Sequence, residues 1–249
     1  MNFSIEFNSG AKLMFDMESN EKYNQIAASV SELRKKIEMA AEKSGRKGSD
    51  IMLLAATKTR TSKEIHAAVL AGVDAVGENR VQELLSKYEQ GAYSGTALHY
   101  IGTLQSNKVK YLIGKATLIH SADSEKLAAL ISRLSEEAGK TTEILLEINI
   151  GKEHSKSGAM PENATAICQR IQEFKGIRLR GLMAIPPVSE PENCRRYFSE
   201  MRELFCGIRE NAPEGFDILS MGMSNDYGIA VEEGSTMVRI GRGIFGERH

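Results

Sequence analysis

Residues 50–80 read DIMLLAATKTRTSKEIHAAVLAGVDAVGENR. This stretch predicts a strand, a helix and a second strand. The apolar run Ile51–Thr57 shows little alternation, which is typical of a strand buried on both faces of a parallel sheet. A helical pattern over Ser62–Ala71 follows, and a second apolar run, Ala75–Gly77, comes directly after it. Lys58 stands at the end of the first strand. The stretch therefore predicts a strand–helix–strand unit with an amine at a strand end.

The same alternation of apolar runs and helical patterns continues to the C-terminus. Eight predicted strands cover Ile51–Thr57, Ala75–Gly77, Leu98–Leu104, Leu118–Ser121, Glu143–Ile150, Arg180–Ile185, Ile218–Met221 and Met237–Ile240. Seven predicted helices lie between them, at Ser62–Ala71, Arg80–Tyr88, Asn107–Ile113, Ser124–Ala138, Pro161–Phe174, Glu192–Glu210 and Asp226–Glu233. This α/β pattern over 249 residues predicts a (β/α)8 TIM barrel. A doubly wound open sheet is the alternative.

An additional N-terminal helix is predicted at Tyr23–Ser44, where apolar residues recur at steps of three and four. It precedes the first strand and is expected to fill the outer-ring position left open after the eighth strand. Residues 1–20 do not match the pattern and are expected to form an N-terminal extension, irregular or with a short extra element. Because no Pro/Gly/Ser-rich linker divides the rest, residues 21–249 are expected to form one domain.

Composition excludes several classes of protein. The net charge is −1 with both signs interspersed, so no nucleic-acid partner is expected. No apolar run approaches the roughly 20 residues needed to span a bilayer, and the N-terminus lacks a signal-peptide pattern, so no membrane insertion or secretion is expected. The three cysteines have no CxxC spacing, which favours a reduced, cytoplasmic chain without a metal site. The GxGxxG, P-loop and HExxH motifs are absent.

In a barrel of this kind, functional residues gather at the carboxyl ends of the strands. An amine beside an apolar strand loses solvation when it is charged, which lowers its pKa and favours attack on an aldehyde. Lys58 stands at such a place, although a lysine at a strand end also commonly extends into solvent. Both interpretations of Lys58 stay open on this residue alone.

Two further stretches, LSMGMSND (219–226) and MVRIGRGIFG (237–246), follow the seventh and eighth strands. The hydroxyls of Ser220 and Ser224 and the start of a helix suit a phosphate, with a plain capped loop as the alternative. Arg239 lies within an apolar strand, where it serves a ligand or a structural ion pair. Barrels most often hold phosphate at these two loops. Together with Lys58, the loops predict a phosphorylated aldehyde as ligand.

Six motifs in order resemble one known family: LLAATKT, VGENRVQEL, LHYIGTLQSNK, LMAIPP, LSMGMSND and GSTMVRIGRGIFGER. The chain is similar to the pyridoxal 5′-phosphate (PLP) homeostasis proteins from about Tyr23 to its end. Their fold resembles the barrel of alanine racemase, which belongs to the fold-type III class of PLP proteins. This chain departs from the family in small ways; for example, it has Arg60 where a proline is frequent.

The resemblance implies roles for individual residues. Lys58 would form an internal aldimine with PLP, Asn79 would lie near the ring, and Arg239 would face the pyridine nitrogen. The cofactor phosphate would be held by two loops, which contain Ser220, Met223, Ser224, Gly241 and Arg242. Neither a catalytic residue nor a metal ligand is expected.

An arginine beside the pyridine nitrogen disfavours its protonation, so it weakens the electron sink that PLP chemistry requires. The chain also ends at His249 without the additional domain that brings alanine racemase its second base. The sequence therefore favours a carrier over an enzyme: it would buffer or deliver PLP, with PLP-dependent apo-enzymes as acceptors, and maintain vitamin B6 and amino-acid/keto-acid balance. The alternative is a PLP-dependent amino-acid racemase or a related fold-type III enzyme.

Overall fold

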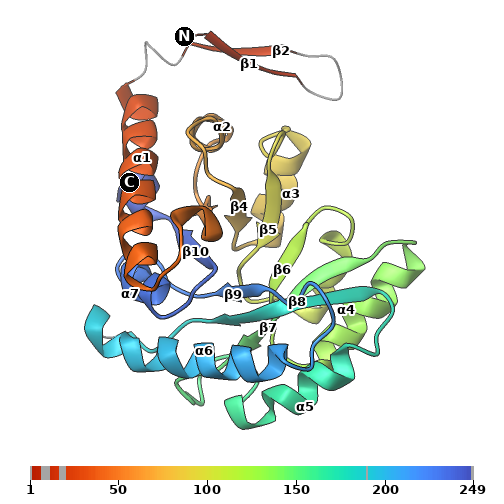
Figure 1. Cartoon of the computed structure of the whole chain (residues 1–249). Coiled ribbons are helices and arrows are strands. Elements are labelled where there is room, and N and C mark those ends of the chain that lie inside the picture. Colours follow the sequence, from red (N-terminus) through yellow and green to blue (C-terminus); the bar gives the residue numbers. More distant parts are fainter. Residues whose placement is uncertain (1, 7–11, 17–20, 189, 248–249) are drawn as a thin grey trace.

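A computed structural model describes residues 2–6, 12–16, 21–188 and 190–247 of the chain. Its parallel strands close into a barrel in the order β10-β3-β4-β5-β6-β7-β8-β9 (Figure 1). The predicted TIM barrel is confirmed, and the open sheet is wrong. The barrel strands are β3 (Met52–Ala56), β4 (Ala75–Glu78), β5 (Ala97–Tyr100), β6 (Leu118–Ala122), β7 (Thr142–Ile148), β8 (Ile177–Ala184), β9 (Ile218–Ser220) and β10 (Met237–Ile240).

The helices surround the barrel and follow the strands in sequence. They are α2 (Ser62–Leu70), α3 (Val81–Glu89), α4 (Glu125–Glu137), α5 (Pro161–Ile171), α6 (Arg195–Arg209), α7 (Tyr227–Glu232) and α8 (Arg242–Phe245). Short 3-10 helices occupy η1 (Gly48–Asp50), η2 (Ser106–Tyr111) and η3 (Pro191–Cys194). The start of α2 has a capping box, in which the Thr61 hydroxyl accepts from the Glu64 amide and the Glu64 carboxylate accepts from the Thr61 amide.

Two predicted elements differ in the region after β5. The helix predicted at Asn107–Ile113 is the 3-10 helix η2, and the strand predicted to Leu104 ends at Tyr100. The chain crosses the end of β4 closely there, because a Cβ on Gly102 would lie 2.1 Å from the Asn79 carbonyl oxygen. Apolar residues after Tyr100 therefore pack in a connection rather than continue the strand.

The predicted N-terminal helix is α1 (Glu21–Lys43), and it packs against α2, α7 and α8. It thus closes the outer ring between the helices of the first and last barrel strands (Figure 1). Its buried face consists of Ile26, Val30, Leu33, Ile37, Ala40 and Ala41. Before α1, β1 (Asn2–Glu6) pairs antiparallel with β2 (Lys12–Asp16), within the segment predicted as an extension.

Two hydrophobic clusters fill the fold. The larger cluster lies between the barrel and its helices, and the smaller one fills the barrel interior with Leu54, Ala75, Ile101, Leu118, Leu145, Met183, Ile218 and Met237. Side chains in a strand alternate between the two sides, so the interior cluster identifies which positions face inward. Polar residues in that inward-facing series mark the chemistry of the barrel mouth.

Candidate functional site

The predicted site residues come from four neighbouring strands. In the closed barrel, β9, β10, β3 and β4 are adjacent, and all of them run parallel. Their carboxyl ends therefore meet along one continuous part of the rim. The structure brings to it Lys58, Asn79, Ser220, Met223, Ser224, Arg239, Gly241 and Arg242.

Lys58 stands two residues beyond Ala56, which packs on the barrel-interior cluster. By strand alternation Lys58 continues the inward-facing series, and its side chain is half-buried. The chain turns sharply here, since the Arg60 amide donates to the Thr57 carbonyl over 3.0 Å and Thr59 has a φ of 65°. The amine is thus carried by a short, closed turn at the barrel mouth.

Asn79 follows β4, and its inward direction is supported by Gly77, where a Cβ would meet the interior side chains of Leu54 and Ile101. The side-chain oxygen of Asn79 is buried and has no hydrogen-bond partner among the described residues. Its main-chain carbonyl accepts from the Tyr100 hydroxyl over 3.3 Å, which fixes the backbone. A buried acceptor without a partner is unfavourable, so this oxygen is available for a ligand donor.

Arg239 lies inside the barrel with only 5% of its surface exposed. Its Nη1 donates to the Ser220 hydroxyl over 2.7 Å and to the Ser220 carbonyl over 2.8 Å, and its Nη2 donates to the Ala184 carbonyl over 3.1 Å. Burial lowers the pKa of Arg239 to about 10, with the carboxylates of Glu147 and Asp226 opposing that shift. The guanidinium is therefore charged at neutral pH, and the Ser220 hydroxyl is used to hold it.

A chain of hydrogen bonds continues from Ser220 across the barrel interior. The His120 Nδ1 lies 3.1 Å from the Ser220 hydroxyl, and the His120 Nε2 lies 3.0 Å from the His99 Nδ1. Burial lowers the pKa of His99 to about 4 and that of His120 well below its usual value. Both imidazoles are neutral at pH 7. His99 is therefore a buried residue whose ring nitrogen Nδ1 is engaged with His120.

Glu147 is a mouth residue that the sequence motifs did not reveal. It stands two positions after Leu145 of the interior cluster, and strand alternation directs it inward. Burial raises the pKa of its carboxyl to about 7, where Asp123 adds to the shift and Arg239 opposes it. The period-two pattern of β7, counted from Leu145, is the sequence signal that places this carboxylate in the barrel.

The loops after β9 and β10 contact each other. The Gly243 amide donates to the Ser224 hydroxyl over 3.3 Å, and the Met223 amide donates to the Asp226 carboxylate over 2.6 Å. Gly222 has a φ of 93°, and a Cβ there would lie 2.6 Å from the Ala230 Cβ, so the loop needs glycine at this position. Within residues 190–247, no acceptor faces the backbone N–H groups of Ser224, Asn225 and Arg242.

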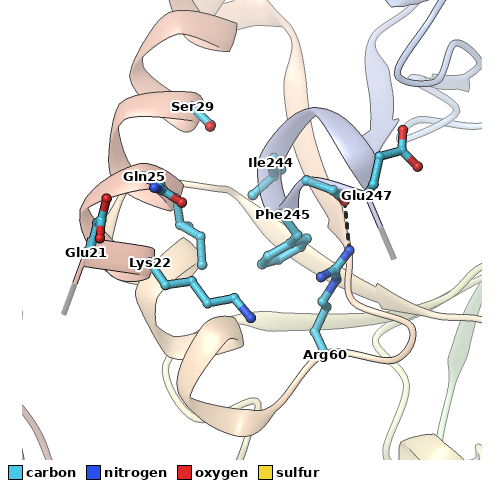
Figure 2. Close-up of a pocket in the computed structure, with 10 residues that line it drawn as sticks. Glu21, Lys22, Gln25, Ser29, Arg60, Ile244, Phe245 and Glu247 are labelled. Carbon is cyan, nitrogen blue, oxygen red and sulfur yellow. Dashed lines mark hydrogen bonds between the residues drawn. The ribbon is translucent and has the colours of Figure 1, made fainter. Parts of the chain in front are cut away.

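Beside this rim lies a cavity of about 730 Å³ (Figure 2). It is lined by the start of α1, by Arg60 and by the segment from Ile244 to Glu247, and none of the predicted site residues lines it. Figure 2 shows the Arg60 guanidinium against this last segment, where its Nη2 donates to the Gly246 carbonyl over 2.9 Å. The cavity therefore differs from the predicted site in its lining, and it contacts the turn after Lys58 through Arg60.

Residues 28–249 match the family model described as alanine racemase, N-terminal domain. The pyridoxal phosphate homeostasis protein of Aquifex aeolicus is 41% identical over 220 residues, covering 88% of this chain and 96% of that protein. That of Escherichia coli K12 is 37% identical, covering 90% of this chain and 97% of its own length. The chain belongs to the pyridoxal phosphate homeostasis protein family.

Several solved structures share the fold. A protein of Bifidobacterium adolescentis superposes with a TM-score of 0.85 at 39% identity, covering 91% of this chain and 97% of that one. PipY of Synechococcus elongatus PCC7942, with PLP bound, gives 0.76 at 30% identity, covering 89% of this chain and 100% of PipY. Alanine racemase of Clostridium difficile 630 is 14% identical with a TM-score of 0.69, which shows a common fold alone.

The described residues also show what the chain offers for membrane spanning, metal binding and cysteine chemistry. Over residues 21–188 and 190–247, no helix is long and apolar enough to cross a membrane. In the same part of the chain, no group of His, Cys, Asp and Glu side chains is arranged to hold a metal ion. Cys168 and Cys206 are free thiols, and burial raises the pKa of the Cys168 thiol to about 12, which makes it unreactive.

Proposed function

We propose that this chain binds PLP at the barrel rim formed by β9, β10, β3 and β4 and buffers or delivers it. The proposal depends on one observation: Lys58 directly follows β3, which pairs with β10, and β10 bears Arg239 and leads into Arg242. The names of the family relatives and the PLP bound to PipY support the same ligand.

The residues at the rim fit each part of PLP. A half-buried amine, Lys58, suits an aldehyde. The backbone N–H groups of Ser224, Asn225 and Arg242 lack acceptors within the described residues and suit a phosphate. The unpartnered side-chain oxygen of Asn79 suits the ring hydroxyl as a donor.

The roles proposed for the predicted residues follow from these positions. Lys58 attaches the cofactor covalently, and the loops bearing Met223, Ser224, Gly241 and Arg242 hold its phosphate. Ser220 has a different part, because its hydroxyl accepts from Arg239 inside the barrel. We therefore assign Ser220 to positioning the guanidinium, with the phosphate held by the neighbouring loop residues.

Bound PLP supplies an aldehyde for attachment and a ring that withdraws electrons from a substrate. Arg239 is charged, and its three hydrogen bonds to Ser220 and Ala184 hold it in place. A fixed cation that faces the pyridine nitrogen disfavours protonation there and so limits the strength of electron withdrawal. The chain accordingly retains the cofactor without rapid turnover of amino acids.

The wider proposals concern partners, location and domains. Apo-enzymes that depend on PLP are the expected acceptors, and the cytoplasm is the expected location, since the three cysteines have no CxxC spacing. Residues 21–249 are proposed as the PLP-binding unit, with residues 1–20 as an extension to it. Maintenance of vitamin B6 and amino-acid/keto-acid balance would follow from the delivery of PLP.

A transfer experiment tests the proposed function. The PLP-loaded protein is mixed with a PLP-dependent apo-enzyme, and recovery of that enzyme's activity is compared with recovery in free PLP at the same total concentration. A carrier restores the activity, while the chain alone racemises amino acids far below an ordinary kcat of about 1 per second. Racemisation at or above that rate would contradict the carrier function and establish an enzyme.

A further inference from the structure

A buried charged cluster lies directly behind the Lys58 turn. Glu78 ends β4 and is fully buried, and by alternation it faces away from the barrel interior, toward α3. The Lys87 ammonium of α3 donates to the Glu78 carboxylate over 2.7 Å, to the Glu83 carboxylate over 2.7 Å and to the Thr57 carbonyl over 2.8 Å. All three of its N–H donors are therefore satisfied within one cluster.

The cluster forms hydrogen bonds to the chain on both sides of Lys58. On the N-terminal side, the Thr57 hydroxyl donates to the Glu78 carboxylate over 2.7 Å. On the C-terminal side, the Thr59 amide donates to the Glu83 carboxylate over 2.5 Å. One lysine and two carboxylates thus fix the residues that immediately precede and follow the reactive amine.

The turn needs these hydrogen bonds because its backbone conformation is unfavourable. Thr59 has a φ of 65°, which lies in the left-handed region that a β-branched residue rarely adopts. Such a conformation persists only where the surroundings determine it. The bond from the Thr59 amide to Glu83 is a contact that holds this residue in place.

The composition of the cluster also points to a role beyond packing. Glu78 Oε1 accepts from Lys87, Thr57 and the Tyr93 hydroxyl, whereas Glu78 Oε2 is buried and finds no partner in the part of the chain that the structure describes. Burying such charges gains little stability compared with apolar residues of the same volume. A cluster whose bonds converge on one turn is better explained by the direction that it gives to that turn.

We propose that Glu83, together with Lys87 and Glu78, positions Lys58 for covalent attachment of PLP by holding the Thr57–Arg60 turn. The inference rests on the proposed function for the identity of the ligand and on the hydrogen bonds for the positioning. These residues act through Lys58 and are not assigned any contact with the cofactor.

Glu83 provides the test, because its side chain is 22% exposed and its removal leaves the Lys87–Glu78 pair intact. The rate of formation of a borohydride-reducible adduct at Lys58 is measured for the full-length wild-type protein and for Glu83→Ala, Glu83→Gln and Glu89→Ala. Glu89 is an exposed carboxylate on the same helix and serves as the matched control. Pyridoxine 5′-phosphate, which lacks the aldehyde, measures non-covalent binding separately.

We expect Glu83→Ala to slow attachment about tenfold, Glu83→Gln to restore much of the rate through its amide oxygen, and Glu89→Ala to match the wild type. Binding of pyridoxine 5′-phosphate should change less than about twofold, which a general loosening of the site would not allow. An unchanged attachment rate in Glu83→Ala, or an equal loss of pyridoxine 5′-phosphate binding, would overturn the positioning role.

A second readout separates this inference from the proposed function. Competitive acetylation of the cofactor-free protein reports the reactivity of Lys58 without PLP, with the exposed Lys63 as an internal reference. The positioning role predicts that the Lys58 rate in Glu83→Ala approaches the Lys63 rate, and an unchanged ratio contradicts it. If wild-type protein forms no PLP adduct, the proposed function fails, and the acetylation ratio still decides the positioning role.

Discussion

Inside the barrel, the Arg239 guanidinium donates to the Ser220 hydroxyl over 2.7 Å, and the same hydroxyl lies 3.1 Å from the His120 Nδ1. Ser220 therefore joins a charged strand residue of β10 to a neutral histidine of β6. Ser220 therefore stabilises side chains inside the barrel, whereas Ser224 lies on the loop after β9.

The two serines should respond differently to removal of the hydroxyl. Ser220→Ala removes one of the three hydrogen bonds of Arg239 and the partner of His120 Nδ1, and should lower the free energy of unfolding by about 1–3 kcal/mol. Ser224→Ala should change that free energy by less than about 0.5 kcal/mol and weaken PLP retention about tenfold. Urea denaturation of cofactor-free protein and PLP dissociation measure the two effects. Equal destabilisation by both substitutions would contradict the assignment.

Glu147 should make stability depend on pH in a defined window. Its folded pKa of about 7 lies above the ordinary 4.5, so between these values the native carboxyl holds a proton that the unfolded one has lost. The native state thus loses stability as the pH rises through this window. The free energy of unfolding of Glu147→Gln should exceed that of the wild type by about 1–2 kcal/mol at about pH 8. The two proteins should differ little at about pH 4.

The exposed Glu200 of α6 provides the control for this comparison. Glu200→Gln should follow the wild-type pH profile, because its carboxylate stays in solvent. Thermal unfolding of cofactor-free protein across the pH range provides the measurement. A constant difference between Glu147→Gln and wild type at every pH would show that the carboxyl of Glu147 does not titrate in this window.

Arg60 should stabilise the C-terminal segment of the barrel. Its guanidinium donates to the Gly246 carbonyl over 2.9 Å, lies 5.3 Å from the centre of the Phe245 ring and stands 3.6 Å from the Glu64 carboxylate. Arg60→Ala should lower the free energy of unfolding by about 1–3 kcal/mol. Arg209→Ala, on the exposed face of α6, should change it by less than about 0.5 kcal/mol. Similar losses of unfolding free energy in Arg60→Ala and Arg209→Ala would contradict the stabilising role of Arg60.

The fold and the amine were within reach of sequence reasoning, because each depends on local patterns. The β3 run and the α2 capping box mark the strand and the helix on either side of Lys58. The alternation of strands and helices gives the barrel. The family resemblance is confirmed by the family match, while the roles of individual residues stay predictions.

The interior contacts were beyond reach because they join residues far apart in the chain. The hydrogen bond between His120 and Ser220 spans 100 positions, and no motif relates the two. Glu147 is one of two acidic residues in an apolar strand, and only the closed barrel brings it near Arg239. The hydrogen bond from Lys87 to the Thr57 carbonyl could not be predicted either, because the two residues lie 30 positions apart.

Peptide mass spectrometry after borohydride reduction identifies the lysine to which PLP is covalently attached. We expect the reduced PLP adduct on the peptide containing Lys58. We also expect Lys58→Ala to lose the adduct while circular dichroism shows an intact barrel, and Lys63→Ala to keep it. An adduct that persists on another lysine in folded Lys58→Ala would contradict the assignment of Lys58.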